Sequence, residues 1–273
     1  MVKTKKMVLC LALLVMAIIP AFAQQQYNDE KEFRARPIDG GKGVEIIEYI
    51  GDKWEVRIPP RIQNLPVTRI GNGENKAFDD SLINIIIPDS VTSIGDSAFF
   101  LCKNLTSITL PDGVTSIGNE AFGGCENLTN ITIPNGVTSI GDRAFIYCEN
   151  LTNITIPNGV TSIGDRAFFL CKNLTSITIP ASVKTIGRDT FGSCINLTSV
   201  TFQGTISSSS LDSGAFGYNY EPDFDNSSKN YIYSYSHYSS IGDLRDKFYA
   251  RNKANGTPGT YKRQKGSDKW TKQ

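Results

Sequence analysis

The chain has 273 residues, of which 40% are hydrophobic and 20% are charged, and this ordinary globular composition excludes disorder along the whole length. Its formal net charge is +1, and without the three N-terminal lysines it holds 25 basic and 27 acidic residues. Binding to nucleic acid needs concentrated basic charge, so this balance argues against a nucleic-acid partner.

The first 23 residues have the three parts of a secretory signal peptide. Lys3, Lys5 and Lys6 precede an apolar run over residues 7–19, and an Ala-Phe-Ala cleavage sequence ends at Ala23. An uncleaved membrane anchor is the alternative, but the apolar run of about 13 residues is shorter than the ~20 needed to cross a bilayer. We therefore expect export, to the medium or the cell surface, and no membrane span in the mature chain.

Residues 24–64 predict an N-terminal β cap. Residues 44–49 and 54–58 have the composition of strands, and they are followed at residues 67–71 by Val-Thr-Arg-Ile-Gly, the first match to the pattern that comes next. The spacing from Ile70 to Phe78 and from Phe78 to Leu82 departs from that pattern. We expect a bulged turn at this point.

A 23-residue unit then repeats over residues 82–197, with the pattern L-x-x-I-x-I-P-x-x-V-x-x-I-G-x-x-A-F-x-x-C-x-x. A unit this short cannot bury a core alone, so stacked units must share one. The pattern predicts an α/β-type repeat solenoid, mostly β, with one coil per 23 residues. Its phenylalanines and cysteines should form columns, at Phe99, Phe122, Phe145, Phe168 and Phe191 and at Cys102, Cys125, Cys148, Cys171 and Cys194.

Alternation along the first strand of each unit separates a buried face from an exposed one. Leu105, Ile108 and Leu110 should point inward, and Ser107 and Thr109 outward. Proline should end the strand because it cannot donate to the ladder. Val114 and Ile117 should return to the core as a second short strand before a glycine turn at Gly118.

The mature chain has five cysteines, an odd number for a set of disulfides. A regular column would hold neighbouring Cβ atoms near the strand spacing, which is longer than the ~3.8 Å that a disulfide prefers. We expect buried free thiols that act as small apolar groups. No cluster of ligands predicts a metal site or a cofactor.

The outward side chains form a regular array of small neutral groups. Such an array suits an extended protein or glycan better than a small molecule, which needs a deep pocket. The alternative is that these residues are solvated and merely favourable in strands. The candidate binding residues are Ser107, Thr109, Asn130, Thr132, Asn153, Thr155, Ser176 and Thr178, and the array continues at Ser199 and Thr201.

Two further features leave alternatives open. Phe100, Tyr147 and Phe169 could form an apolar contact edge or could cover the neighbouring repeat. The Asn-Leu-Thr triplets, such as the one at Asn127, match the glycosylation acceptor but are also explained by hydrogen bonding in the turn.

Residues 205–273 predict an irregular C-terminal cap with a basic tail. The tyrosine-rich residues 218–238 either bind a ligand or cap the last repeat. Residues 241–252 predict a short helix that carries Leu244 and Phe248. Residues 259–273 predict a hairpin in which Tyr261 and Trp270 form a cross-strand pair.

Nothing in the sequence predicts an enzyme. The only histidine, His237, lies in the tyrosine-rich segment, and no glycine-rich phosphate loop follows a strand. Glu45 with Glu48, or Asp142 with Asp165, remains as a formal carboxylate pair.

The repeat resembles the BspA-like, Treponema-type leucine-rich repeat, with the Ile-Gly, Ala-Phe and Cys positions recurring together over residues 82–197. The flanks are similar to the same group. The resemblance implies leucine-rich repeats over residues 65–204, between the N-terminal cap and the C-terminal cap. It also implies a secreted or cell-surface protein-binding adhesin for matrix proteins such as fibronectin or fibrinogen, or for other cells; a surface repeat protein without a specific ligand is the alternative.

Overall fold

The computed structural model describes residues 27–212, 214–217, 222–225, 230–233, 244–249, 255–265, 267 and 269–273. The expected signal peptide and most of the tyrosine-rich segment, with His237, lie outside the described residues. Among the residues described, no helix is long and apolar enough to span a membrane.

The described N-terminal part begins with a 3-10 helix and a set of strands. Its elements are η1 (Glu30–Glu32), β1 (Phe33–Ile38), β2 (Gly43–Tyr49), β3 (Glu55–Arg57), β4 (Arg61–Ile62) and β5 (Leu65–Ile70). The strands expected in residues 44–49 and 54–58 are confirmed as β2 and β3. The sequence did not predict β1, which pairs antiparallel with β2, whereas β2 already pairs in parallel with β5. The parallel ladder therefore starts within residues 24–64; the division of the chain into domains stays a prediction.

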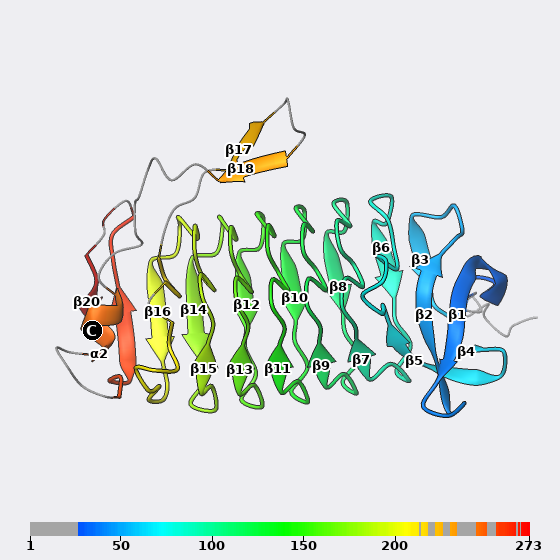
Figure 1. Cartoon of the computed structure of the whole chain (residues 1–273), viewed down its shortest axis with the longest axis horizontal. Helices are drawn as coiled ribbons and strands as arrows, with labels where there is room; N and C mark the ends of the chain where they lie inside the picture. The colour runs from blue at the N-terminus through cyan, green and yellow to red at the C-terminus, as the bar shows by residue number, and fades with distance from the viewer. Residues whose placement is uncertain are drawn as a thin grey trace, which may run out of the picture.

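Each coil of the repeat, here called a rung, contains a longer strand followed by a two-residue strand. The longer strands are β6 (Asn84–Ile86), β8 (Ser107–Thr109), β10 (Asn130–Thr132), β12 (Asn153–Thr155), β14 (Ser176–Ile179) and β16 (Ser199–Phe202). The short strands are β7 (Ser93–Ile94), β9 (Ser116–Ile117), β11 (Ser139–Ile140), β13 (Ser162–Ile163) and β15 (Thr185–Ile186). Figure 1 shows the rungs stacked in chain order along the long axis of the molecule, which confirms the predicted solenoid.

The two kinds of strand form separate walls of the solenoid, one of longer strands and one of short strands. The short strands continue a nine-stranded sheet that also contains β1, β2, β4 and β5. The longer strands fall into three sheets, β3–β6, β8–β10–β12 and β14–β16–β19–β20. The wall of longer strands is thus interrupted twice, between β6 and β8 and between β12 and β14.

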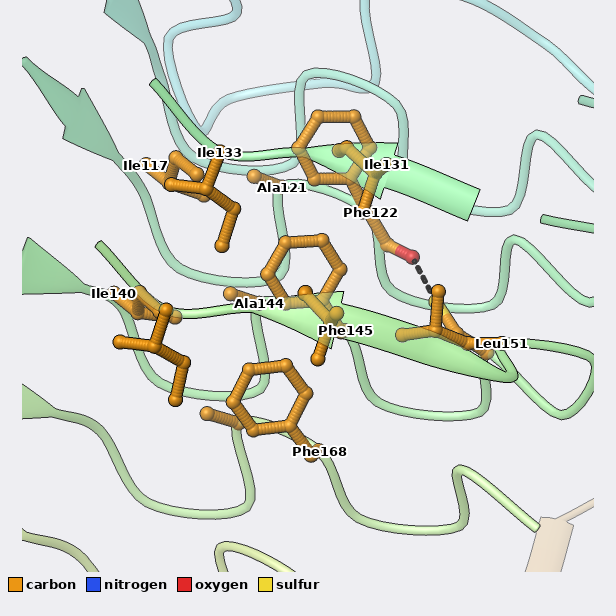
Figure 2. Close-up of a cluster of buried hydrophobic side chains, with 14 of the residues drawn as sticks. Ile117, Ala121, Phe122, Ile131, Ile133, Ile140, Ala144, Phe145, Leu151 and Phe168 are labelled. Carbon is orange, nitrogen blue, oxygen red and sulfur yellow. Dashed lines mark hydrogen bonds between the residues drawn. The ribbon is translucent and has the colours of Figure 1, made fainter. Parts of the chain in front are cut away.

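Phenylalanine rings form a continuous stack through the core. Phe122, Phe145 and Phe168 lie one above the other in Figure 2, with ring centroids 5.3 Å apart and planes within 6° of parallel. The stack runs from Phe78 to Phe216, and Tyr49 extends it into the N-terminal part. The ring centroid of Phe78 lies 5.3 Å from that of Phe99, although the residue spacing around Phe78 departs from the repeat pattern. The buried ring of every rung adds apolar contact with the next rung to that of the leucine, isoleucine and valine side chains of the core.

The five cysteines are free and buried, as the sequence predicts. The Cys148 thiol donates to the carbonyl oxygen of Phe122 at 3.2 Å, and the Cys125 and Cys171 thiols make the same bond one rung away on either side. Burial raises the pKa of these thiols, for Cys194 to about 12. They are therefore small apolar groups of the core that also give a second hydrogen bond to a carbonyl which already accepts a backbone N–H, as the Phe122 carbonyl does from Cys125 at 3.2 Å.

Glycine follows the short strand because the rungs approach closely there. A Cβ on Gly141 would lie 2.7 Å from the backbone nitrogen of Asn119 in the preceding rung. The φ angle of Gly141 is not in the left-handed region, so close approach rather than backbone freedom explains this residue. Proline plays its expected part: its carbonyl begins the turn after the longer strand, as in the 3.0 Å bond from Val114 N–H to Pro111.

The described C-terminal residues form regular structure. The elements are a hairpin of β17 (Pro222–Asp225) and β18 (Asn230–Tyr233), α2 (Leu244–Tyr249), β19 (Gly259–Lys262) and β20 (Thr271–Lys272). Of these, β19 pairs with β16 and covers the last rung together with α2, whereas the β17–β18 hairpin is drawn apart from that rung in Figure 1. The predicted helix is confirmed, and Leu244 and Phe248 on it are buried; Phe248 stacks on Phe202 with centroids 3.9 Å apart. These described segments contain strands and a helix, so they are more regular than the predicted irregular cap.

The predicted hairpin over residues 259–273 is confirmed, but the predicted pairing in it is wrong. Tyr261 lies opposite Lys272 in the register of β19 and β20, not opposite Trp270. Trp270 instead faces the guanidinium of Arg263, which is 5.3 Å from the ring centroid. The register differs because β19 ends at Lys262 and β20 begins only at Thr271, so the connection is longer than a pairing of Tyr261 with Trp270 requires.

Candidate functional site

The outward residues of the longer strands form one polar surface, here called the strand face. All eight candidate residues are exposed, two on each of β8, β10, β12 and β14. Ser107, Asn130 and Asn153 are partners in the parallel register, and so are Thr109, Thr132 and Thr155. The pattern of exposure places Ile108, Ile131 and Ile154 between them on the buried side. The structure therefore brings the candidate residues together; their role in binding stays a proposal.

The side chains of the strand face keep their hydrogen-bonding capacity. Within the described residues, Asn153 alone among the eight bonds to another protein group, a 3.4 Å contact with Thr152. In contrast, the threonines just before the strands are engaged: the Thr129 hydroxyl donates to the carbonyl of Thr106 at 3.2 Å. A ligand on the strand face would meet donors and acceptors that are bonded only to water.

A groove crosses the strand face where the sheet is interrupted between β12 and β14. It has a volume of about 360 Å³ and is lined by four of the candidate residues, Asn153, Thr155, Ser176 and Thr178, together with Asn158 and Gln203. This groove was not predicted from the sequence, because the rungs on its two sides follow the same repeat pattern and nothing in that pattern marks an interruption. Gln203 and Asn158 are therefore candidate contact residues that the sequence did not reveal.

The strand face ends at the C-terminal cap. Ser199 and Thr201 continue the array, but β16 pairs antiparallel with β19, and the hydroxyl of Thr201 lies 2.9 Å from that of Thr260. Both residues are only partly exposed. The accessible array therefore runs over β8, β10, β12 and β14.

At the other end, the strand face begins with exposed apolar side chains. The register of β3 and β6 aligns Glu55 with Asn84, so Trp54 and Ile83 occupy the position that Thr106 has in the next rung. Trp54 is 61% exposed and Ile83 is 44% exposed. The sequence analysis treated Trp54 only as the start of a strand. Alignment of the cap with the repeat would have revealed its position.

The apolar residues beside the phenylalanine column cover neighbouring rungs. A Cβ on Gly123 would lie 3.0 Å from the Phe100 ring, and one on Gly192 would lie 2.8 Å from the Phe169 ring. Phe169 is buried, and Tyr147 packs against the small cluster that it forms with Ile146 and Leu170. The structure thus favours the covering role over an apolar contact edge.

The asparagines of the Asn-Leu-Thr triplets form a ladder across the turns. The Asn173 amide donates to Asn150 at 3.1 Å, and Asn150 donates to Asn127 at 3.4 Å. This geometry supports the structural explanation of the triplets.

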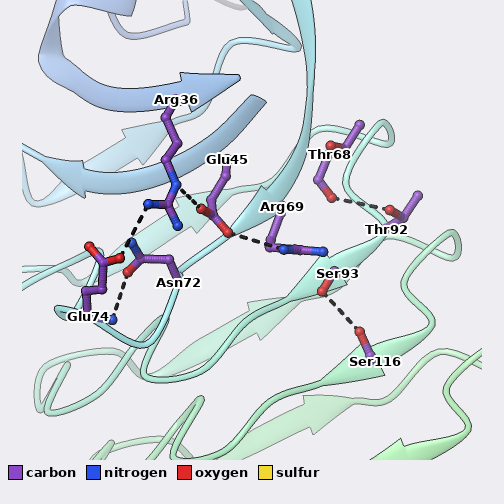
Figure 3. A network of polar contacts seen from close by, with 9 residues as sticks. All are labelled: Arg36, Glu45, Thr68, Arg69, Asn72, Glu74, Thr92, Ser93 and Ser116. Carbon is purple, nitrogen blue, oxygen red and sulfur yellow. Dashed lines mark hydrogen bonds and ion pairs between the residues drawn. The ribbon is translucent and has the colours of Figure 1, made fainter. Parts of the chain in front are cut away.

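The carboxylates that the sequence left as formal pairs each have another partner. Glu45 is buried and accepts from Arg36 at 2.8 Å, with Arg69 at 3.5 Å (Figure 3), whereas Glu48 pairs with Arg34 at 2.6 Å. The Asp142 carboxylate accepts a hydrogen bond from the backbone N–H of Asp165 at 2.8 Å. This bond is one of a column of contacts between the turns that follow the short strands. In the part of the chain that the structure describes, no three His, Cys, Asp or Glu side chains gather as a metal site.

The model of the BspA type leucine rich repeat region matches residues 68–198 and 138–241, in six copies. No curated protein matches the chain. Among solved structures, the chain is 25% identical to the T. pallidum leucine rich repeat protein, with a TM-score of 0.52 over 63% of this chain and 91% of that one.

A leucine-rich repeat protein from Bacteroides ovatus is 31% identical, with a TM-score of 0.50 over 65% of this chain and 53% of that one. A leucine rich cell surface protein from Faecalibacterium prausnitzii is 32% identical, with a TM-score of 0.48 over 65% of this chain and 54% of that one. The chain thus spans about half the length of these two relatives, and the structural likeness extends over the repeats.

Proposed function

Because this chain belongs to the BspA-type leucine-rich-repeat family, we propose that it is an exported binding protein, an adhesin that recognises matrix proteins or other cells through its strand face. Leucine-rich-repeat solenoids are typically binding or scaffold folds, since stacked units build broad surfaces rather than enclosed sites. The N-terminal pattern of basic residues, apolar run and Ala-Phe-Ala supports export, to the medium or to the cell surface.

The observation that carries the proposal is the strand face itself. Four strands present eight exposed, uncharged side chains, and seven of these form no hydrogen bond to another protein group among the described residues. A wall of this kind offers many weak contacts over a long distance, so affinity accumulates from rung to rung. Fibronectin and fibrinogen, which are extended matrix proteins, are the partners to test first.

The test compares one substitution at two places in the same rung. Thr132→Arg puts a long charged side chain in the middle of the strand face, whereas Thr138→Arg puts it on an exposed residue just before β11, in the wall of short strands. Binding of the purified chain, without residues 1–23, to immobilised fibronectin, fibrinogen and whole cells should fall at least about tenfold for Thr132→Arg only. Equal effects of both substitutions would refute the strand face as the binding surface.

The alternative is a structural or immune-facing surface rod without a specific ligand. The continuous columns of rings, thiols and amides favour it, because they would stabilise a rod whatever its surface carried. Failure of the unmodified protein to bind any matrix protein or cell would support this alternative.

A further inference from the structure

An exposed tryptophan begins the column of residues that leads onto the strand face. The carbonyl oxygen of Trp54 accepts a hydrogen bond from the backbone N–H of Ile83 at 2.8 Å, so Trp54 and Ile83 belong to adjacent rungs. The indole N–H of Trp54 has no hydrogen-bond acceptor within the described part of the protein. A ring that is 61% exposed is a flat apolar platform at the margin of an otherwise polar surface.

Beyond Glu55 and Arg57, the outward residues of β3 that follow Trp54, the strand face carries no charge from β8 onward. From β8 to β14 its exposed side chains are hydroxyls and amides, which both donate and accept hydrogen bonds. A ligand that matches them must be neutral and must carry groups that also donate and accept. The hydroxyls of a sugar have this property.

The spacing of the rungs adds a geometric match. Stacked phenylalanine centroids lie 5.2 to 5.4 Å apart through the repeats, and the paired strands β8, β10 and β12 are spaced by about 4.8 Å. Both distances are close to the length of one pyranose unit in an extended glycan. A glycan that runs along the solenoid axis would therefore present one sugar to each rung, between the Trp54 platform and the groove between β12 and β14.

We propose that the strand face, with Trp54 at one end and the groove lined by Asn153, Ser176 and Gln203 at the other, is a binding site for an extended neutral glycan. The inference rests on the proposed binding function and names its ligand class. Trp54 stacks on the apolar face of one sugar, and the asparagine, serine and threonine side chains bind the hydroxyls of those that follow. The glycan would be carried by a matrix glycoprotein or by a neighbouring cell.

A peptide ligand matches the same surface less well. Protein hot spots are apolar or arginine side chains seated in pockets, and the strand face from β8 to β14 has neither outward apolar residues nor charges. Addition of a strand would need a free sheet edge, whereas β8, β10 and β12 are paired with one another and present a face.

The experiment measures binding of the purified chain, without residues 1–23, to an array of neutral, sialylated and sulfated oligosaccharides, and then titrates the best neutral one in solution. Trp270 is 1% exposed, so a change in tryptophan emission on titration reports on Trp54. We expect binding to neutral glycans, a loss of about tenfold in affinity for Trp54→Ala, and partial recovery for Trp54→Phe. Ile195→Ala, which removes an exposed apolar side chain at the far end, is the control and should bind as the unmodified protein does.

Four outcomes separate the two proposals. Binding only to anionic glycans, or to none, overturns the glycan inference, as does equal binding to fibronectin before and after its glycans are removed. If fibronectin binding persists and is lost in Thr132→Arg but unchanged in Trp54→Ala, the strand face binds protein, and the proposed function stands without this inference. If the unmodified protein binds neither glycan nor matrix protein nor cell, both fail.

Discussion

The thiol of Cys148 donates a hydrogen bond to the carbonyl oxygen of Phe122, which lies 26 residues earlier in the chain and 3.2 Å away. The same relationship links Cys125 to Phe99 and Cys171 to Phe145. Each thiol thus fills the core of its own rung and joins it to the rung before.

Replacement of one such thiol should destabilise the protein by two effects. Cys148→Ala removes one of the two hydrogen bonds that the Phe122 carbonyl accepts and opens a small cavity, with an expected cost of about 1–3 kcal/mol. Urea unfolding followed by circular dichroism measures it. The matched control is Cys102→Ala, because the Cys102 thiol is 3.6 Å from its carbonyl at the irregular rung and should cost less. Equal losses would contradict a contribution from the hydrogen bond.

Stability should fall as the pH rises above the ordinary thiol value of 9.0. Burial raises the pKa of Cys125, Cys148 and Cys171, so the folded protein holds protons that the unfolded chain releases. Their contribution is complete below pH 9 and is lost as the pH rises from there toward the folded-state pKa values, by up to about 1.4 kcal/mol per pH unit for each thiol. Urea unfolding at pH 7.5, 9 and 10 gives the free energy of unfolding at each pH. This free energy should fall less steeply with pH in Cys148→Ala than in the unmodified protein. The same slope in both would refute the assignment.

Close approach of the rungs makes Gly141 sensitive to a single methyl group. Gly141→Ala places a Cβ 2.7 Å from a backbone nitrogen of the preceding rung, and the loss of stability should be about 2 kcal/mol or more. Gly113→Ala is the matched control, since its Cβ would meet nothing closer than 3.6 Å. Thermal unfolding compares the two; a loss at Gly113 as large as that at Gly141 would contradict close contact between rungs as the cause.

Arg263 should be essential for closing the C-terminal end. Its guanidinium donates to the carbonyl oxygens of Leu197 at 2.7 Å, Ser267 at 3.0 Å and Ile195 at 3.3 Å. Arg263→Lys cannot reproduce the planar set of donors, so we expect a loss of about 1.5–3 kcal/mol. Hydrogen exchange of the amides in β16 and β19 should accelerate, whereas Lys262→Ala, at an exposed neighbour, should leave it unchanged. Unaltered exchange in Arg263→Lys would contradict this role.

The repeat made most of the core predictable. Because its units follow one pattern, however, the sequence did not show where on the solenoid most of the candidate site lies. Phe145 and Cys148 could be placed because equivalent residues recur every 23 positions, and stacking leaves them only one environment. The groove between β12 and β14 could not be predicted, since the two rungs beside it follow the same repeat pattern and nothing in that pattern marks where pairing stops. Trp54 and β1 lie outside the repeat, where position is set by tertiary contacts rather than by period.

The uniform rungs also bear on how such a chain varies between generations. Near-identical stretches of sequence favour unequal exchange during copying of the gene, which adds or removes whole units. Because every rung meets its neighbours through the same ring, thiol and amide contacts, an added unit would extend the rod and its surface while both ends kept the partners that they have now. The length of the solenoid can thus change by one coil at a time, while the packing of each rung stays the same.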